Sequence, residues 1–247
     1  MDAVILAAGS GSRIREYHDL PKGFLQIGGE SLILQTIKIL QYYGINRILI
    51  VTGYKADYYI NLFAKNSMVE LVYNSEYETT DSLYSWYLAK KWIGNDFLLL
   101  ESDLLFPESA VGAILSSKYS NDVLLSGETL SGDEVYVETK DDIFVTSNKR
   151  KNELDHVSGE LIGVSKFSAS FYKSLLILLE CNMEQYKHYH YEEILEIMTK
   201  EDPIYCTKIN ELLWSEVDDI EQLNRAKNLY NQIRENSKIF SPYEGLQ

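Results

Sequence analysis

Cysteine is scarce in this sequence of 247 residues, and its spacing excludes a disulfide framework. The two cysteines, Cys181 and Cys206, stand far apart and form no Cys-x-x-Cys pair. Disulfide-dependent secreted domains carry several closely spaced cysteines, whereas proteins of the reducing cytosol do not need them. We therefore expect a cytoplasmic protein.

Long apolar runs are also missing from the sequence. No segment approaches the roughly 20 consecutive apolar residues that span a bilayer, so we expect no membrane insertion. The apolar start at residues 1–8 is short and has no basic segment before it. That composition argues against a signal peptide.

Basic side chains are outnumbered: 23 Lys and Arg face 37 Asp and Glu, which gives a formal net charge of -14. A nucleic-acid scaffold normally presents a basic surface, so no nucleic-acid partner is expected. Acidity of this degree supports solubility and is compatible with a cationic ligand or a bound metal ion.

The length and the apolar share of 45% suit one α/β domain with a substantial core. Expected strands at residues 3–8, 47–52, 70–74 and 97–101 alternate with expected helices at 31–43, 56–65 and 81–91. This alternation predicts a Rossmann-like, mostly parallel central sheet with helices on both faces.

The second half of the chain is less regular. Short strands are expected at 123–126, 135–138, 143–146 and 161–164, and helices at 168–179, 191–199 and 220–234. We interpret this half as a small mixed β/α substrate-binding insertion. The prediction is a single domain over 1–236, with a nucleotide-binding half at about 1–105, an acceptor-binding half at about 106–236, and a loosely held tail at 237–247.

A glycine-rich segment follows the first expected strand, and Pro21-Lys22 comes shortly after it. Glycines at such a place let backbone N–H groups approach a phosphate or a base closely. Arg13 and Lys22 are candidates to neutralise a triphosphate. The candidate nucleotide-binding residues of this segment are Leu6, Ala8, Gly9, Ser10, Gly11 and Ser12.

The segments LAAGSGSRI (6–14) and PKGFLQIGGESLI (21–33) resemble the signature of nucleotidyltransferases that activate sugar phosphates and related compounds. The resemblance implies that the glycine-rich loop binds the NTP, that Arg13 and Lys22 grip its phosphates, and that two carboxylates hold Mg²⁺. It extends to Thr80, Asp81 and Ser82, which resemble the segment that closes over the nucleotide in the cytidylyltransferase branch. That branch usually has Asn where this chain has Asp81.

Two acidic residues are the candidate magnesium ligands. Asp103 follows an expected strand, where open parallel sheets place their ligand sites, and Mg²⁺ prefers such oxygen ligands. The plain alternative is a solvated loop acid or a helix N-cap. Asp218 resembles the late acidic motif of the family, and we expect it to point inward while Asp219 caps the following helix.

The acceptor site is expected in the second half. Residues 156–168 resemble the GE-x-x-G stretch of enzymes similar to phosphocholine and 2-aminoethylphosphonate cytidylyltransferases. Aromatic faces and carboxylates can enclose an ammonium, although the same residues at 189–193 also fit an ordinary helix start. Glu160 either recognises the amine or orients its loop. The candidate acceptor-binding residues are Lys149, Glu160, Tyr189, Tyr191 and Glu192.

Together these residues predict a magnesium-dependent cytidylyltransferase that transfers CMP from CTP to phosphocholine, 2-aminoethylphosphonate or a similar amine-bearing acceptor. One alternative is the same chemistry on a sugar or polyol phosphate with CTP, UTP or dTTP. Another is a non-catalytic regulatory protein with the same fold. A second copy of the chain, forming a homodimer, is counted among the candidate partners.

Overall fold

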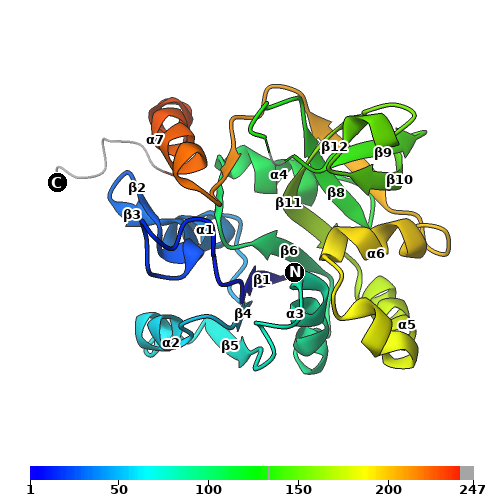
Figure 1. Ribbon diagram of the computed structural model, residues 1–247, viewed down its shortest axis with the longest axis horizontal. Helices are drawn as coiled ribbons and strands as arrows, with labels where there is room; N and C mark the ends of the chain where they lie inside the picture. Colours follow the sequence, from blue (N-terminus) through cyan, green and yellow to red (C-terminus); the bar gives the residue numbers. More distant parts are fainter. Residues whose placement is uncertain (133, 240–247) are drawn as a thin grey trace.

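The computed structural model describes residues 1–132 and 134–239 (Figure 1). Within these residues, nine strands form one mixed sheet in the order β5-β4-β1-β6-β11-β8-β12-β10-β9. The larger part of the predicted tail, residues 240–247, lies outside the described residues.

The first half of the sheet is parallel, as the sequence predicts. Its strands are β1 (Asp2–Ala7), β4 (Ile48–Thr52), β5 (Val69–Tyr73) and β6 (Phe97–Glu101). β1 lies between β4 and β6 and pairs with both in parallel. Because both faces of these strands are covered, they are continuous apolar runs.

The second half continues the same sheet with mixed strand directions. Its strands are β8 (Asp122–Ser126), β9 (Tyr136–Lys140), β10 (Ile143–Asn148), β11 (Gly159–Phe167) and β12 (Tyr205–Ile209). β11 runs antiparallel to both β6 and β8, whereas β12 is parallel to β8. The mixed character predicted for this half agrees with these directions, but its strands extend the central sheet instead of forming a small insertion. The central sheet as a whole is therefore mixed, because short apolar runs do not reveal strand direction.

Helices cover both faces of the sheet. On one face, α1 (Leu32–Tyr42), α2 (Asp57–Phe63) and α4 (Glu108–Ser116) share a core with Ala3 and Ile5 of β1. On the other, α3 (Ser82–Leu88), α5 (Ala169–Tyr186) and α6 (Tyr191–Met198) pack with Val4 and Leu6. This alternation follows from the two-residue period of a strand.

A third cluster holds α7 (Ile220–Glu235) against the hairpin of β2 (Gln26–Ile27) and β3 (Glu30–Ser31), which lies beside it in Figure 1. The short pair β7 (Leu104–Leu105) and β13 (Ser215–Glu216) joins this region to the end of β6. Single 3₁₀ turns occur at η1 (Lys22–Phe24), η2 (Ala89–Lys91) and η3 (Lys151–Glu153).

The start of the predicted tail is held more firmly than expected. The hydroxyl of Ser237 and the backbone N–H of Lys238 both donate to the carboxylate of Glu108. No helix among the described residues is long and apolar enough to cross a membrane.

Candidate functional site

A cavity of about 550 Å³ opens at the carboxyl ends of β1 and β6. Its walls come from the loop after β1, the start of α3, the middle of β11, the start of α6 and the segment around β13. The crevice outside the carboxyl ends of parallel strands is where open α/β sheets bind ligands. The lining residues that the sequence predicted as site residues are Leu6, Ala8, Gly9, Ser10, Arg13, Lys22, Thr80, Asp81, Ser82, Asp103, Lys149, Glu192 and Asp218.

The glycine-rich loop forms the wall next to β1. A Cβ at Gly9 would meet nothing within 4 Å, so the backbone there is open to the cavity. Gly11 has φ +58, and a Cβ on it would lie 2.9 Å from Cγ of Lys22. Glycine at 11 therefore lets the stem of Lys22 pass behind the loop. Gly11 and Ser12 lie outside the lining and shape this turn instead.

The segment that begins α3 is fixed to the sheet by buried hydrogen bonds. The side-chain amide of Asn74, just past β5, donates to Oγ1 of Thr80 at 3.2 Å and to Oγ of Ser85 at 3.1 Å. Oγ of Ser82 accepts from the backbone N–H of Tyr191 at 2.8 Å. These bonds hold Thr80, Asp81 and Ser82 at the cavity wall.

Lys22 links the two carboxylates that the sequence assigns to metal. Its ammonium contacts Asp103 and lies 2.5 Å from Oδ1 of Asp218, and both acids are 5% exposed. Nη2 of Arg13 lies 2.5 Å from Oδ2 of Asp218. Asp103 and Asp218 thus converge within reach of one cation, although they are far apart in sequence.

Electrostatics favours the ionised form of this network. Burial opposes the charge of Lys22, but Asp103 and Asp218 outweigh it and hold the pKa of Lys22 above its usual value. Burial likewise opposes the charge of Asp218, yet Lys22 and then Arg13 hold its pKa below the usual range.

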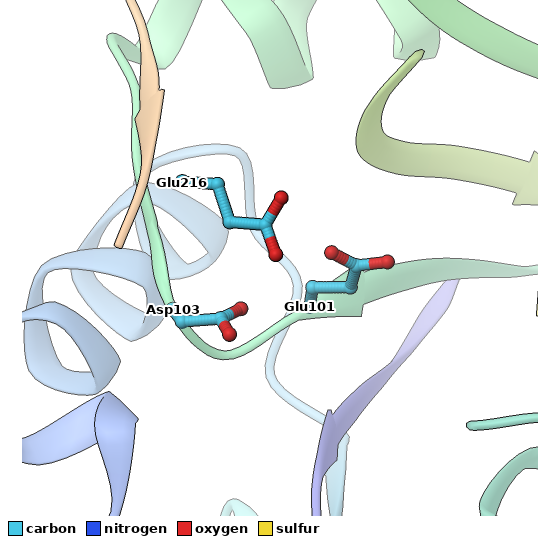
Figure 2. A group of neighbouring side chains, drawn as sticks. All are labelled: Glu101, Asp103 and Glu216. Carbon is cyan, nitrogen blue, oxygen red and sulfur yellow. The ribbon is translucent and has the colours of Figure 1, made fainter. Parts of the chain in front are cut away.

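Three carboxylates gather beside this network. Oxygen atoms of Glu101, Asp103 and Glu216 lie within 4.8 Å of one another, and Figure 2 shows the three side chains pointing toward a common space. Burial and then the neighbouring carboxylates raise the pKa of both Glu101 and Glu216. Such repulsion falls when a cation enters, and a set of hard oxygen donors suits Mg²⁺.

Sequence reasoning missed Glu101 and Glu216. Glu101 is the last residue of β6, and Glu216 stands two residues before Asp218 in β13. The sequence held a signal for each of them. Glu101 ends a buried apolar strand, and Glu216 lies two positions before Asp218, a spacing that in an extended chain puts both side chains on the same side.

The cavity wall also carries Lys149, just past β10, and Glu192, in the first turn of α6. Burial raises the pKa of Glu192 against the attraction of His190 and Lys149. Glu134 lines the cavity as well. Burial opposes its charge, but hydrogen bonds from the Gly132 N–H and the Tyr136 hydroxyl hold the pKa of Glu134 below its usual value.

Three residues predicted to bind the acceptor do not line the cavity in the structure. Tyr191 is 1% exposed, and its ring packs at 6.3 Å from that of Trp86 in the core. Tyr189 packs edge-on against Tyr186 at 5.2 Å. The Tyr191 ring points into the core because α6 turns its apolar face inward at positions 191, 194, 195 and 198. Tyr189 precedes α6, is partly buried and does not line the cavity.

Glu160 is likewise absent from the cavity wall. It is fully buried in β11, and both of its carboxylate oxygens accept the backbone N–H of Thr129 at 2.9 Å. The sequence left two roles open for Glu160, recognition of the amine or orientation of its loop. This contact favours the second. The predicted N-cap is confirmed, since the Asp219 side chain accepts from the N–H of Gln222 at 2.8 Å.

A mixed α/β sheet whose parallel strands carry a glycine-rich loop, two cations and clustered carboxylates at their carboxyl ends is typical of a nucleotidyltransferase. Residues 3–157 match the family described as the MobA-like NTP transferase domain, and the chain belongs to this family. The family that the sequence motifs suggested is thereby confirmed.

Individual relatives act on different substrates. The chain is 34% identical over 120 residues to a choline-phosphate cytidylyltransferase of Streptococcus pneumoniae, covering 48% of this chain and 52% of that protein. It is 25% identical over 230 residues to a bifunctional IPC transferase and DIPP synthase of Aquifex aeolicus, covering 91% of this chain and 50% of that protein. The chain therefore spans about half the length of these two relatives.

A solved structure shares the fold. The inositol-1-phosphate CTP transferase from T. maritima superposes with a TM-score of 0.79 at 21% identity, covering 96% of this chain and 97% of that one.

Proposed function

We propose that this protein is a magnesium-dependent cytidylyltransferase that transfers CMP from CTP to a small amine-bearing phosphomonoester or phosphonate and releases pyrophosphate. The observation that carries the proposal is that cations and carboxylates from separate elements line one cavity. Lys22 and Arg13 line it with the glycine-rich loop, and Lys149, Glu134 and Glu192 line the same cavity.

Lys22 and Arg13, at the glycine-rich loop, suit the triphosphate. The open backbone at Gly9 leaves room for phosphate oxygens, and Arg13 and Lys22 supply positive charge next to it. Arg13 can bind two phosphate oxygens at once, while Lys22 acts as a point charge. Thr80, Asp81 and Ser82 line the same cavity from the start of α3 and are assigned to the nucleoside.

Asp103, Glu101 and Glu216 are assigned to the metal, with Asp218 beside them. When bound, Mg²⁺ offsets the charge that develops on the α-phosphate and on the leaving pyrophosphate. Asp218 also orients Arg13 and Lys22, since it contacts both of them.

The reaction is a direct displacement. An anionic oxygen of the acceptor phosphate or phosphonate attacks the α-phosphorus of CTP and forms a new P–O bond. The bond from that phosphorus to the β-phosphate oxygen breaks, and pyrophosphate leaves with the electron pair. No side chain needs to remove a proton, because the nucleophile is already ionised. The chain brings two anions together and stabilises their charge.

Glu192 and Glu134 suit a cationic substituent of the acceptor. Lys149 is assigned to the phosphate or phosphonate of the acceptor and Glu192 to its ammonium. A partly buried carboxylate such as Glu192 gains a partner when an ammonium enters. The relative that uses choline phosphate, as its name states, supports an acceptor of this kind.

A second candidate is a polyol phosphate acceptor. The relative described as an IPC transferase matches 91% of this chain, which favours that alternative. Pyrophosphate release with Mg²⁺ separates the two, when each NTP is tested against phosphocholine, 2-aminoethylphosphonate and a panel of sugar and polyol phosphates. Turnover with CTP and an amine-bearing acceptor supports the proposal. Turnover with polyol or sugar phosphates alone refutes its acceptor assignment, and no turnover with any pair refutes the reaction.

A further inference from the structure

Glu160 carries a fully buried carboxylate that the proposed reaction does not use. It lies in β11 between two neighbours, opposite Ser126 of β8 and Tyr136 of β9. These two residues flank the connection from β8 to β9. Glu160 therefore stands at the base of that connection, between the points where the chain leaves the sheet and returns to it.

The connection contributes a wall of the cavity. Ser131, Glu134 and Val135 all line it, next to Leu161 and Ile162 of β11. The backbone at Leu130 and Gly132 is left-handed, with φ of 57 and 96, so the described part of the connection makes tight turns rather than a strand.

One strong contact fixes this connection to the sheet near its start. Both oxygens of Glu160 accept the N–H of Thr129, each at 2.9 Å. A hydrogen bond to a carboxylate is stronger than one between neutral groups, and it is stronger still away from water. Surface contacts such as the pair of Lys151 and Glu128 at 2.8 Å are exposed and contribute less.

The contact between Glu160 and Thr129 acts on the cavity wall formed by Ser131, Glu134 and Val135. Thr129 lies two residues before Ser131, and the carboxylate of Glu134 in turn accepts the N–H of Gly132 at 3.0 Å. A displacement at Thr129 therefore moves Ser131 and changes the surroundings of Glu134. The glycine-rich loop lies on other elements and has no part in this chain of contacts.

We propose that Glu160 is a positioning residue for the acceptor: its carboxylate holds Thr129, and thereby sets the cavity wall formed by Ser131, Glu134 and Val135. This inference rests on the proposed function, since it assigns that wall to the acceptor. Glu160 contacts no substrate itself.

The test compares Glu160→Ala and Glu160→Gln with the unmodified protein. The Gln side chain keeps one oxygen that can accept the Thr129 N–H. We expect Glu160→Ala to raise the KM for the acceptor about tenfold, as expected for the loss of a hydrogen bond to a charged group. The KM for CTP should stay within about twofold, and Glu160→Gln should recover most of the loss.

Glu108→Ala is the matched control. Glu108 is also a buried glutamate that accepts a backbone N–H, from Lys238, but it lies outside the cavity wall. The Glu108→Ala substitution should lower the stability of the protein without changing the KM for the acceptor. An equal rise of both KM values in Glu160→Ala, or the same acceptor effect in Glu108→Ala, would overturn the proposal.

Hydrogen exchange separates this inference from the proposed function. In Glu160→Ala, amides of residues 128–132 should exchange faster, while those of the glycine-rich loop should not change. Unchanged exchange at 128–132 overturns the anchor whatever the acceptor proves to be. Faster exchange supports the anchor even if no amine-bearing acceptor is turned over, a result that refutes only the proposed function.

Discussion

The ammonium of Lys22 lies 2.5 Å from Oδ1 of Asp218 and also contacts Asp103. Lys22, which we assign to the triphosphate, is thus paired with the two carboxylates that the sequence assigned to the metal. If metal and nucleotide bind as proposed, Lys22 exchanges partners: it turns from the carboxylates to the phosphates as the metal ion takes its place. In the absence of nucleotide, Lys22 would then compete with the metal.

Replacing Lys22 with Met should tighten metal binding in the absence of nucleotide. The variant removes the competing charge while the carboxylates remain, so we expect Mn²⁺ affinity to rise about tenfold or more, equivalent to one charge-assisted hydrogen bond. Calorimetric titration of the nucleotide-free protein with Mn²⁺ measures this. CMP transfer should fall sharply in the same variant.

Lys55→Met serves as the control for that titration, because Lys55 pairs with Asp19 outside the cavity wall. It should leave Mn²⁺ affinity unchanged. Weaker Mn²⁺ binding in Lys22→Met than in the unmodified protein would contradict the exchange of partners.

Replacing Glu192 with Gln should weaken selection of amine-bearing acceptors. The substitution keeps the size of the side chain and removes its charge, so the KM for phosphocholine should rise about 10- to 100-fold. The KM for CTP should change little. Steady-state kinetics with each substrate varied in turn measures both.

The neighbouring Glu193→Gln provides a matched comparison. The carboxylate of Glu193 accepts the N–H of His190 at 2.6 Å and lies outside the cavity wall. It should affect helix stability rather than the acceptor KM. If both variants raise the acceptor KM equally, Glu192 is not the ammonium partner.

Replacing Tyr191 with Phe tests the placement of that residue in the core. Since the ring packs beside Trp86 and does not line the cavity, the acceptor KM should stay within about twofold. Tyr191→Ala should instead destabilise the protein by about 3–5 kcal/mol, as for other large-to-small core substitutions. Chemical denaturation and kinetics together measure this, and a large KM effect in Tyr191→Phe would place the hydroxyl at the ligand.

A buried lysine gives a pH dependence of stability. Nζ of Lys166 donates to the carbonyls of Ile114 at 3.0 Å and Ser117 at 2.9 Å, near the end of α4. Burial lowers the pKa of Lys166 from its usual 10.5, against the attraction of Asp122 and Asp96. Between the lowered pKa and 10.5, the unfolded chain binds more protons than the folded one, so this group makes stability rise with pH.

Denaturant unfolding of the unmodified protein and of Lys166→Met measures that contribution. The difference in unfolding free energy between them, unmodified minus variant, should increase as the pH is raised from neutrality toward 10.5. A difference that stays constant or decreases over this range would show that the folded-state pKa of Lys166 is not lowered.

The sequence predicts the first half of the fold well for a physical reason. β1, β4 and β6 are buried on both faces, so they appear as continuous apolar runs bounded by turns. In contrast, β12 (Tyr205–Ile209) is only partly buried and has no apolar run, and α4 is a short helix of nine residues after Pro107. Both were missed because tertiary packing rather than local pattern stabilises them.

The candidate site also has residues that local sequence predicts and residues that only the tertiary fold brings in. Lys22, Asp103 and Asp218 were identified because motifs mark them, but Glu101 and Glu216 join them only through the meeting of β6 and β13. Tyr191 was predicted as an acceptor-binding residue from its aromatic and acidic neighbours. Its helical spacing with residues 194, 195 and 198 turns it into the core instead. Strand direction in the second half depends on the return path of the chain, which residue type does not encode.

The most direct test of the account is ³¹P NMR of the reaction of CTP with 2-aminoethylphosphonate or phosphocholine in the presence of Mg²⁺. The account predicts pyrophosphate together with a new pair of coupled phosphorus signals from CMP joined to the acceptor. Both should fall by about three orders of magnitude in Asp103→Asn, because a proposed ligand of the metal is lost. Cleavage of CTP without the coupled pair, a coupled product with polyol phosphates alone, or full activity in Asp103→Asn would contradict it.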